Sequence, residues 1–338
     1  MNAPDRYPDT KDEPVTFVTI AFSGDLALIR LQARSMARFL RPEEVGEILL
    51  VMNEADETAL RRALTSLAAD YGPHREKLRI LTGDEVLMGR ERTRQPTLFE
   101  RVYVENRFRL PFLRRGGWRG GNGYRMQQAL KLASARAARF RRMVILDGKN
   151  IFLRAPRPNE WFAADGRARL AYETVGPAFH RNWLRESLDM LDVRVPPEKV
   201  QETSGYTTPY PVSRRLVLDV LDALESRHGS VQSVFAGKRR PSEFMLIFAF
   251  CLKHFGGPHA VFENVEKEQV GLWDSFDAQA RDKALTAAET DTPLTFGLHR
   301  NTVSQLDAVG RRRIVTLFAE RGIDISTVVP DASPAQDD

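Results

Sequence analysis

Apolar runs alternate with amphipathic segments over the first third of the chain. Residues 15–22 and 47–53 lack an alternation of polar and apolar positions, which is typical of strands that are buried on both faces. Apolar positions recur at helical spacing over residues 26–40 and 56–70, and residues 78–82 predict a third strand. This β-α-β-α-β order predicts an α/β fold with a parallel sheet and right-handed crossovers.

The rest of the chain continues as predicted helices and strands. The segment 203–213, TSGYTTPYPVS, is interpreted as a loop that carries proline and tyrosine. We predict helices at 124–140, 182–191, 214–228 and 241–255, and strands at 143–146, 151–153, 169–174 and 294–301. Together the elements predict one domain over residues 15–329, between a flexible segment at 1–14 and a disordered polar tail at 330–338.

Residues 84–121 interrupt this pattern. The stretch is rich in arginine, has few regular apolar repeats and ends in the sequence GGWRGGNG. Long irregular insertions in compact domains are usually functional or disordered, so we expect a flap or acceptor loop, with an ordinary surface loop as the alternative. The glycines do not follow a strand, as those of a dinucleotide-binding G-x-G-x-x-G motif would.

The composition of the 338 residues is that of a globular protein, with 42% hydrophobic and 28% charged residues. No apolar stretch approaches the roughly 20 residues of a membrane-spanning helix, and the polar N-terminus lacks the apolar region of a signal peptide. The single cysteine, Cys251, excludes an internal disulfide and lies in an apolar run, where we expect it to be buried and inert. These features predict a cytoplasmic protein.

The formal net charge is +5, and arginines cluster among aromatic residues between positions 90 and 119. Nucleic acid could bind such a stripe, but a nucleotide diphosphate or an anionic glycan fits the same arginines as well. The sequence has no His-Glu-x-x-His, G-x-S-x-G or Walker lysine motif. Their absence argues against zinc hydrolases, enzymes with a nucleophile elbow and P-loop NTPases.

Polar residues follow the predicted strands at their carboxyl ends. Ligands bind beyond this edge in open parallel sheets, which nominates residues 22–25, Asn53 and residues 83–84 as one rim. The strongest local signal lies at the end of a later strand, in the sequence ILDGKNIFL, where Asp147-Gly148-Lys149-Asn150 forms the turn.

A carboxylate at the end of a buried strand is costly unless it has a partner or a function. Asp147 could hold a divalent cation with the help of Asn150, and the cation would bind a diphosphate. Alternatively, the Lys149 ammonium could balance phosphate charge without a metal. The third interpretation is a β-turn in which Asp147 hydrogen-bonds to its own backbone.

The chain between residues 15 and 305 contains, in this order, the segments VTFVTIAF, EILLVMN, GYRMQQALKLASA, VILDGKNIFLRAP, SGYTTPYPVS, PSEFMLIFAF and GLHRN. This order resembles the GT-A-fold glycosyltransferases, and more narrowly a bacterial group associated with surface-polysaccharide loci. The resemblance implies a Rossmann-type single domain with a mostly parallel central sheet flanked by helices. It also implies transfer of a sugar from a UDP-type nucleotide-sugar donor to a glycan or lipid-linked acceptor, with Mn²⁺ or Mg²⁺ as a candidate cofactor.

The resemblance also implies roles for individual residues. The metal-binding Asp-x-Asp position corresponds to Asp147 and, imperfectly, to Lys149, which leaves metal dependence open. His299, which the strand at 294–301 delivers to a loop, would complete a metal shell with Asp147 and Asn150.

Glu243, just after the helix-start residues Pro241 and Ser242, matches an acidic catalytic residue of these enzymes. It would remove the acceptor proton in an inverting reaction. The residues expected to bind the donor are Thr19, Ala21, Phe22, Asp25, Asn53, Gln128, Lys131, Lys149 and Asn150, and those expected to bind the acceptor are Tyr206, Tyr210 and Trp118.

These residues have simpler interpretations as well. Glu243 could complement the helix dipole, His299 could be a surface histidine, and the aromatic residues could merely pack a loop. Gln127, Gln128 and Lys131 span adjacent helical turns, so we do not expect all of them to face a ligand.

Two other functions stay open. A sugar nucleotidyltransferase on a similar sheet would need a glycine- and arginine-rich loop after the first strand, where Ser23-Gly24-Asp25 is too short. The other is a non-catalytic protein, either a degenerate nucleotide-sugar binder or, less favoured, a nucleic-acid binder that uses the arginine stripe.

Overall fold

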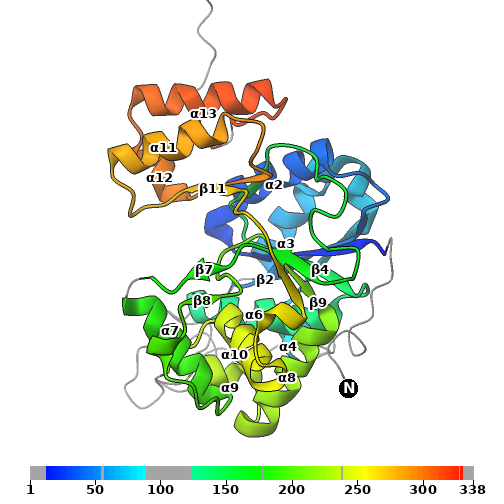
Figure 1. Cartoon of the computed structure of the whole chain (residues 1–338). Helices are drawn as coiled ribbons and strands as arrows, with labels where there is room; N and C mark the ends of the chain where they lie inside the picture. The colour runs from blue at the N-terminus through cyan, green and yellow to red at the C-terminus, as the bar shows by residue number, and fades with distance from the viewer. Residues whose placement is uncertain are drawn as a thin grey trace, which may run out of the picture.

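The computed structural model describes residues 13–54, 57–88, 123–176, 178–236, 239–326 and 328–329. Within them, the central sheet consists of β1 (Val15–Ala21), β2 (Val45–Met52), β3 (Leu78–Leu81), β4 (Arg142–Leu146) and β9 (Tyr210–Ser213). Their spatial order is β3-β2-β1-β4-β9, with β9 antiparallel to β4 and the other neighbours parallel. The predicted α/β fold, with a mostly parallel central sheet flanked by helices, is confirmed (Figure 1).

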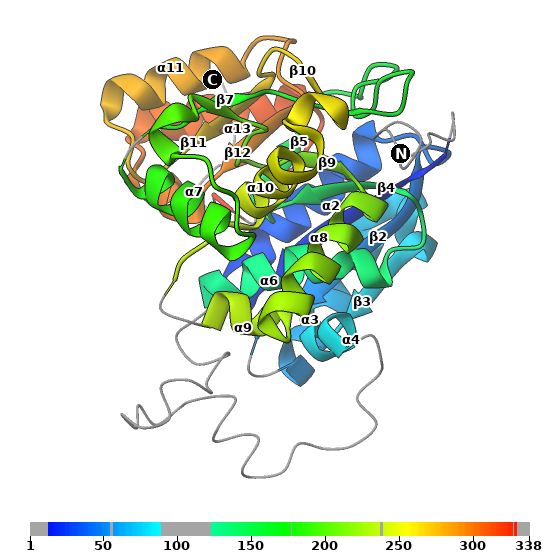
Figure 2. The same cartoon turned by 60° about the horizontal axis from the view of Figure 1, so that its bottom comes forward.

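Helices cover both faces of this sheet. α2 (Leu26–Phe39) and α3 (Glu57–Ser66) follow β1 and β2 on one face, and α6 (Gly123–Ala137) packs against β1 and β2 from the other. The helices beside α6 are α4 (Gly83–Met88), α8 (Arg214–His228), α9 (Val231–Ala236) and α10 (Glu243–Phe255), and α7 (Ala178–Met190) packs against α10. Figure 2 shows α6, α8 and α9 together on this side.

A second sheet continues from the turn after β4. β5 (Asn150–Phe152) pairs antiparallel with β12 (Thr295–Leu298), which pairs parallel with β11 (Gln269–Leu272). The apolar cluster of this part includes Leu28 and Leu31, so α2 packs against both sheets. The helices beside it are α11 (Ala278–Ala288), α12 (Arg300–Gln305) and α13 (Ala308–Glu320), and smaller strand pairs are β6 (Ala168–Leu170) with β10 (Phe262–Asn264) and β7 (Glu173–Thr174) with β8 (Glu202–Thr203).

The predicted loop over residues 203–213 is wrong at its end, where β9 closes one side of the described central sheet. Tyr210 and Val212 are buried, and both pair with β4. Pro211 has no N–H to donate, which an edge strand tolerates because one of its sides needs no ladder partner. Pro211 therefore agrees with the place of β9 at the edge of the described central sheet.

Other boundaries also differ from the prediction. Residues 169–174 are divided between β6 and β7, and the predicted insertion at 84–121 begins with α4 rather than with irregular chain. Residues 89–122, which hold Trp118 and the arginine stripe, lie outside the described residues. Of the N-terminal segment expected to be flexible, 1–14, residues 1–12 lie outside them too, as does the C-terminal tail at 330–338.

α10 is apolar along most of its length because it is buried in the core. It places the free thiol of Cys251 there, and burial raises the pKa of that thiol, in agreement with an inert side chain. Among the described helices, none combines the length and apolarity that crossing a bilayer requires.

A buried glutamine on α2 connects β1 to the turn after β4. Gln32 Oε1 accepts a hydrogen bond from the Thr19 hydroxyl at 2.9 Å. Gln32 Nε2 donates to the backbone oxygens of Asp147 at 2.8 Å and of Asn150 at 3.1 Å. This single side chain therefore fixes the position of the Asp147–Asn150 turn relative to β1.

Replacing Gln32 by alanine should lower the free energy of unfolding by about 2–4 kcal/mol, because it leaves buried polar groups without partners. Urea unfolding followed by circular dichroism measures the effect. Gln279, an exposed glutamine on α11, is the matched control, and Gln279→Ala should change stability by less than about 0.5 kcal/mol. Equal effects of the two substitutions would contradict the role of Gln32.

Candidate active site

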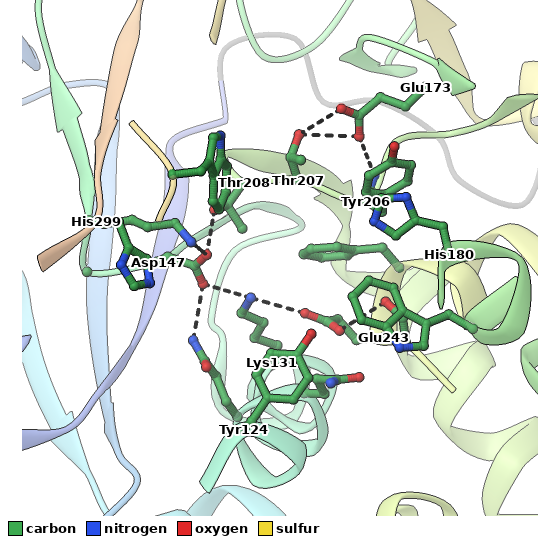
Figure 3. Close-up of a pocket in the computed structure, with 18 of the residues that line it drawn as sticks. Tyr124, Lys131, Asp147, Glu173, His180, Tyr206, Thr207, Thr208, Glu243 and His299 are labelled. Atoms are coloured by element: carbon green, nitrogen blue, oxygen red, sulfur yellow. Dashed lines mark hydrogen bonds and ion pairs between the residues drawn. The ribbon is translucent and has the colours of Figure 1, made fainter. Parts of the chain in front are cut away.

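The carboxyl ends of β1 and β4 meet at one edge of the central sheet. Thr19 of β1 pairs with Leu146 of β4, so the residues that follow each strand lie side by side. A pocket of about 580 Å³ opens at this edge, where ligands bind in open parallel sheets. Figure 3 shows Asp147 in this pocket, with His299 on one side of it and His180 on the other.

The turn Asp147-Gly148-Lys149-Asn150 is closed by its last residue. The Asn150 backbone N–H donates to Asp147 O at 3.0 Å, and Asn150 Oδ1 accepts from the Asp147 N–H at 2.7 Å. Asn150 Nδ2 donates to the backbone oxygen of Thr208 at 3.1 Å. The oxygen and the nitrogen of the Asn150 side-chain amide are thus both hydrogen-bonded to backbone groups. This corrects the expectation that Asn150 binds a metal or the sugar donor.

Gly148 is the residue that this turn needs at its tip. A Cβ at this position would lie 3.0 Å from Ile29 Cγ1 of α2 and 3.7 Å from Asp25 Cβ. The absence of a side chain therefore lets the turn lie directly against α2.

The Asp147 carboxylate is surrounded by donors. Oδ1 lies 2.8 Å from Lys131 Nζ and accepts from Gln127 Nε2 at 3.2 Å. Oδ2 lies 3.1 Å from Lys149 Nζ and accepts from the Thr208 hydroxyl at 2.9 Å. Burial alone would raise the pKa of Asp147, but the two ammonium groups outweigh it and hold the pKa well below its ordinary value.

Lys131 lies between two carboxylates. Its Nζ contacts Asp147 Oδ1 and also Glu243 Oε1, which is 3.0 Å away, and its side chain is only 7% exposed. Burial alone would lower the pKa of Lys131, but the carboxylates of Asp147 and Glu243 raise it above its ordinary value. Glu243 Oε2 accepts from the Ser242 hydroxyl at 3.3 Å and, in the amide orientation that its neighbours indicate, from Gln128 at 3.2 Å.

Cationic side chains form the side of the pocket near β12. Lys149 Nζ lies 4.4 Å from the centre of the Trp273 ring, and His299 Nδ1 lies 2.6 Å from Asp274 Oδ1. Arg300, the first residue of α12, lines the same side. Lys149 and Arg300 place positive charge beside the turn, although Lys149 already contacts Asp147, as His299 contacts Asp274.

Arg300 is packed on the loop that follows β1. Its guanidinium lies 5.0 Å from the Phe22 ring centre and 3.6 Å from Asp25 Oδ1. A Cβ at Gly24 would come within 2.1 Å of Arg300 Nη1 and 2.3 Å of Phe22 Cζ, so a side chain there would displace both groups. Burial raises the pKa of Asp25 against the opposing charge of Arg300, and Asp147 raises it further.

Aromatic side chains form the opposite side. The His180 ring centre is 4.2 Å from that of Tyr206 and 4.0 Å from that of Phe179, whose side chain is 50% exposed. Trp183 lies beside them at 5.1 Å from Phe179. The Tyr206 backbone N–H donates to Glu173 Oε2 at 2.8 Å, which holds this wall against β7.

The pocket brings together many of the residues that the sequence nominated. They are Asp25, Gln128, Lys131, Asp147, Lys149, Tyr206, Glu243 and His299. Gln127 lines the pocket as well. The expectation that Gln127, Gln128 and Lys131 would not all face a ligand is therefore wrong, because the pocket extends around the first turns of α6.

Other nominated residues lie elsewhere. Thr19 and Ala21 are buried within β1, which corrects their assignment to the donor. Tyr210 is 1% exposed and belongs to the core, so it does not offer its ring to an acceptor. The Asn53 amide donates to the backbone oxygen of Gly123 at 2.8 Å and thereby ties the end of β2 to the start of α6.

Several residues in and beside the site were not predicted from the sequence. The sequence could have indicated a buried role for Gln32, because it is a polar residue on the apolar face of an amphipathic helix. No local pattern marks His180, Trp273 or Arg300, because they lie on elements far apart in the chain that only the fold brings to one pocket.

The side chains expected to bind a metal are not arranged to hold a divalent cation. Both Asp147 oxygens already contact ammonium groups, and His299 Nδ1 is held by Asp274. Over the described ranges, no group of three or more His, Cys, Asp or Glu side chains is placed to hold a metal ion. The expected set of Asp147, Asn150 and His299 therefore has no support from the geometry.

Asp147→Asn should lower the free energy of unfolding at pH 7 by about 3 kcal/mol, because it leaves the buried Lys131 with one carboxylate fewer. The pKa of Asp147 is lowered by folding, so its stabilising effect is present above the unfolded-state pKa of about 3.9 and is lost as the pH falls below that value. The difference between wild type and variant should therefore be the same at pH 7 and pH 5 and smaller at pH 3.

Urea unfolding at the three pH values measures this difference. Asp222→Asn, at an exposed position of α8, is the matched control and should change stability by less than about 0.5 kcal/mol. A difference that grows toward acidic pH would contradict the lowered pKa.

No curated protein matches the chain significantly. Similar solved structures include the WbbM bifunctional glycosyltransferase, with 12% identity and a TM-score of 0.44; the match covers 85% of this chain and 46% of that chain. Another is mouse xyloside xylosyltransferase 1, with 12% identity and a TM-score of 0.42; the match covers 87% of this chain and 99% of that chain. A third is the galactosyltransferase LgtC in complex with donor and acceptor sugar analogues, with 9% identity and a TM-score of 0.44; the match covers 95% of this chain and 98% of that chain. The chain spans about half the length of WbbM. These TM-scores lie below 0.5, so the function is argued from the pocket itself.

One sequence profile matches most of the chain. It covers residues 14–270, which include the central sheet, the turn at Asp147 and Glu243. The chain therefore belongs to the family described as Family of unknown function (DUF6492).

Proposed function

We propose that the protein is a glycosyltransferase that moves a sugar from a nucleotide-sugar donor to a hydroxyl group of a glycan acceptor. One observation carries this proposal: a cationic wall and an aromatic wall face each other across the carboxylates of Asp147 and Glu243. Such a pocket offers a place for an anionic leaving group, a place for a sugar ring and a base between them.

The cationic wall suits a diphosphate. Lys149 and Arg300 line the pocket beside the loop that follows β1, and the His299 ring lies next to them. Negative charge builds on the leaving nucleoside diphosphate as its bond to the sugar breaks, and fixed cations stabilise that charge. Their positions on a turn and at a helix start mean that little reorganisation is needed when the donor binds.

The aromatic wall suits the acceptor. Tyr206, His180, Trp183 and Phe179 present ring faces and edges to the pocket, and apolar faces of sugar rings pack against such groups. The Nδ1 atom of His180 has no hydrogen-bond partner within the part of the chain that the structure describes.

Glu243 lies between the two walls (Figure 3). In the proposed reaction the acceptor oxygen attacks the anomeric carbon, and the bond from that carbon to the donor phosphate oxygen breaks. The hydroxyl proton passes to the Glu243 carboxylate, and the nucleoside diphosphate leaves. Asp147 takes no part in bond making; it positions Lys131 and Lys149.

The order of sequence segments that resembles GT-A-fold glycosyltransferases supports the same reaction. We extend the proposal, on that resemblance, to a UDP-type donor and to surface-polysaccharide synthesis. A sugar nucleotidyltransferase is disfavoured because the loop after β1 is a single short helical turn, Ser23–Asp25, that leads directly into α2.

Thermal unfolding with a panel of nucleoside diphosphates and sugar nucleotides tests the function. At saturation, nucleotides of one base should raise Tm by about 3–6 °C, since a ligand at 100 times its Kd contributes about 2.7 kcal/mol. Lys149→Met should remove most of the shift, and Lys283→Met, at an exposed site on α11, should keep it. If no nucleotide stabilises the protein, the proposal fails and a non-catalytic binding protein takes its place.

Glu243→Gln should reduce turnover by about 10²–10⁴-fold, because glutamine can still accept a hydrogen bond from Lys131 but cannot take a proton. Donor affinity should change by less than about threefold. Release of the nucleoside diphosphate in the presence of acceptor measures turnover, and calorimetry measures affinity. The control is Glu320→Gln at an exposed position of α13. Unchanged turnover in Glu243→Gln would remove Glu243 from the mechanism.

A further inference from the structure

We propose that the donor diphosphate is bound without a divalent cation, because the buried ammonium of Lys131 occupies the place beside Asp147 that a metal ion would need. This inference rests on the proposed transfer function and concerns the same pocket. Lys131 Nζ lies 2.8 Å from Asp147 Oδ1 and 3.0 Å from Glu243 Oε1. The ammonium thus bridges Asp147, the carboxylate of the expected metal set, and the Glu243 carboxylate.

Lys131 cannot move aside at low cost. It projects from α6, whose neighbouring residues Leu130 and Leu132 are buried in the core. Its Nζ also lies 5.2 Å from the centre of the Phe244 ring. Moving the ammonium away would leave the carboxylates of Asp147 and Glu243 without their shared cation in a buried setting, which is strongly unfavourable.

The second oxygen of Asp147 is no more accessible to a metal. Oδ2 lies 3.1 Å from Lys149 Nζ and accepts from the Thr208 hydroxyl at 2.9 Å. A divalent ion bound to either oxygen would lie close to an ammonium group, and like charges repel strongly in a partly buried site. Lys149, two positions after Asp147, is thus a cation at the position where a metal site would have a second carboxylate.

The lysines can perform the electrostatic task of the metal themselves. An ammonium carries three N–H donors, and within the described residues Lys131 uses donors toward Asp147 and Glu243. Lys131 also lines the pocket, so a remaining donor is available to a diphosphate oxygen. Lys131 and Lys149 would then bind the leaving group while Asp147 holds both of them in place.

This arrangement has a consequence that a merely structural lysine would not have. Lys131→Met removes the bridging cation and leaves Asp147 and Glu243 facing each other. Adjacent carboxylates favour a hard divalent cation. The variant should therefore acquire a metal requirement that the wild-type protein lacks.

Isothermal titration calorimetry with the nucleoside diphosphate that stabilises the protein most tests this inference on the full chain. The wild-type Kd should agree within about twofold in EDTA and in Mn²⁺. Lys131→Met should bind about 10–100-fold more weakly in EDTA, the loss expected for a charged hydrogen bond. Mn²⁺ should restore most of that loss in the variant. Lys283→Met is the control and should behave as wild type does.

Electron paramagnetic resonance of added Mn²⁺ provides a second measurement that needs no nucleotide. Wild type should leave the Mn²⁺ free, and Lys131→Met should bind it. Nucleotide binding by wild type that is lost in EDTA, or Mn²⁺ bound by wild type and released by Asp147→Asn, would overturn the inference while the transfer function stands. Absence of nucleotide binding in every condition would instead overturn the transfer function, and the inference about its diphosphate with it.

Discussion

The buried negative charge of Asp147 is the constraint on which the pocket depends. A carboxylate at the end of a core strand needs compensation, and it receives it from Lys131 on α6 and Lys149 in its own turn. Lys131 in turn needs a second acceptor, which the first residue of α10 supplies as Glu243. The turn, α6 and α10, the last of them far along the chain, are therefore held in one arrangement by alternating charges. The pocket is the space that this arrangement leaves open.

α2 fixes this arrangement relative to the sheets. Its Gln32 joins Thr19 of the central strand to the backbone of the turn, and its apolar residues pack into the clusters of both sheets. Because the second sheet carries His299 and Arg300 at the end of β12, the position of α2 also sets where the cationic wall lies. Packing in the core thus determines the electrostatics of the pocket.

The proposed replacement of a metal by ammonium groups would change how such a site is built. A divalent ion needs several oxygen or nitrogen ligands that converge on one point, whereas a lysine needs only acceptors for its N–H groups. The site therefore tolerates Lys149 where a second carboxylate would stand, and it uses the Asn150 amide to close the turn. In the proposed reaction, the charge that stabilises the leaving diphosphate would be covalently part of the chain and independent of metal supply.

The sequence by itself determined the α/β class, most helices and strands, and the turn at Asp147, because periodicity and turn residues are local signals. It also nominated Lys131, Glu243 and Tyr206, which the pocket contains. Only the tertiary structure decided that Tyr210 is core and that Lys131 bridges Asp147 and Glu243. The aromatic wall around His180 was likewise beyond the sequence, because its members come from separate elements whose approach depends on long-range packing, and no local pattern records that approach.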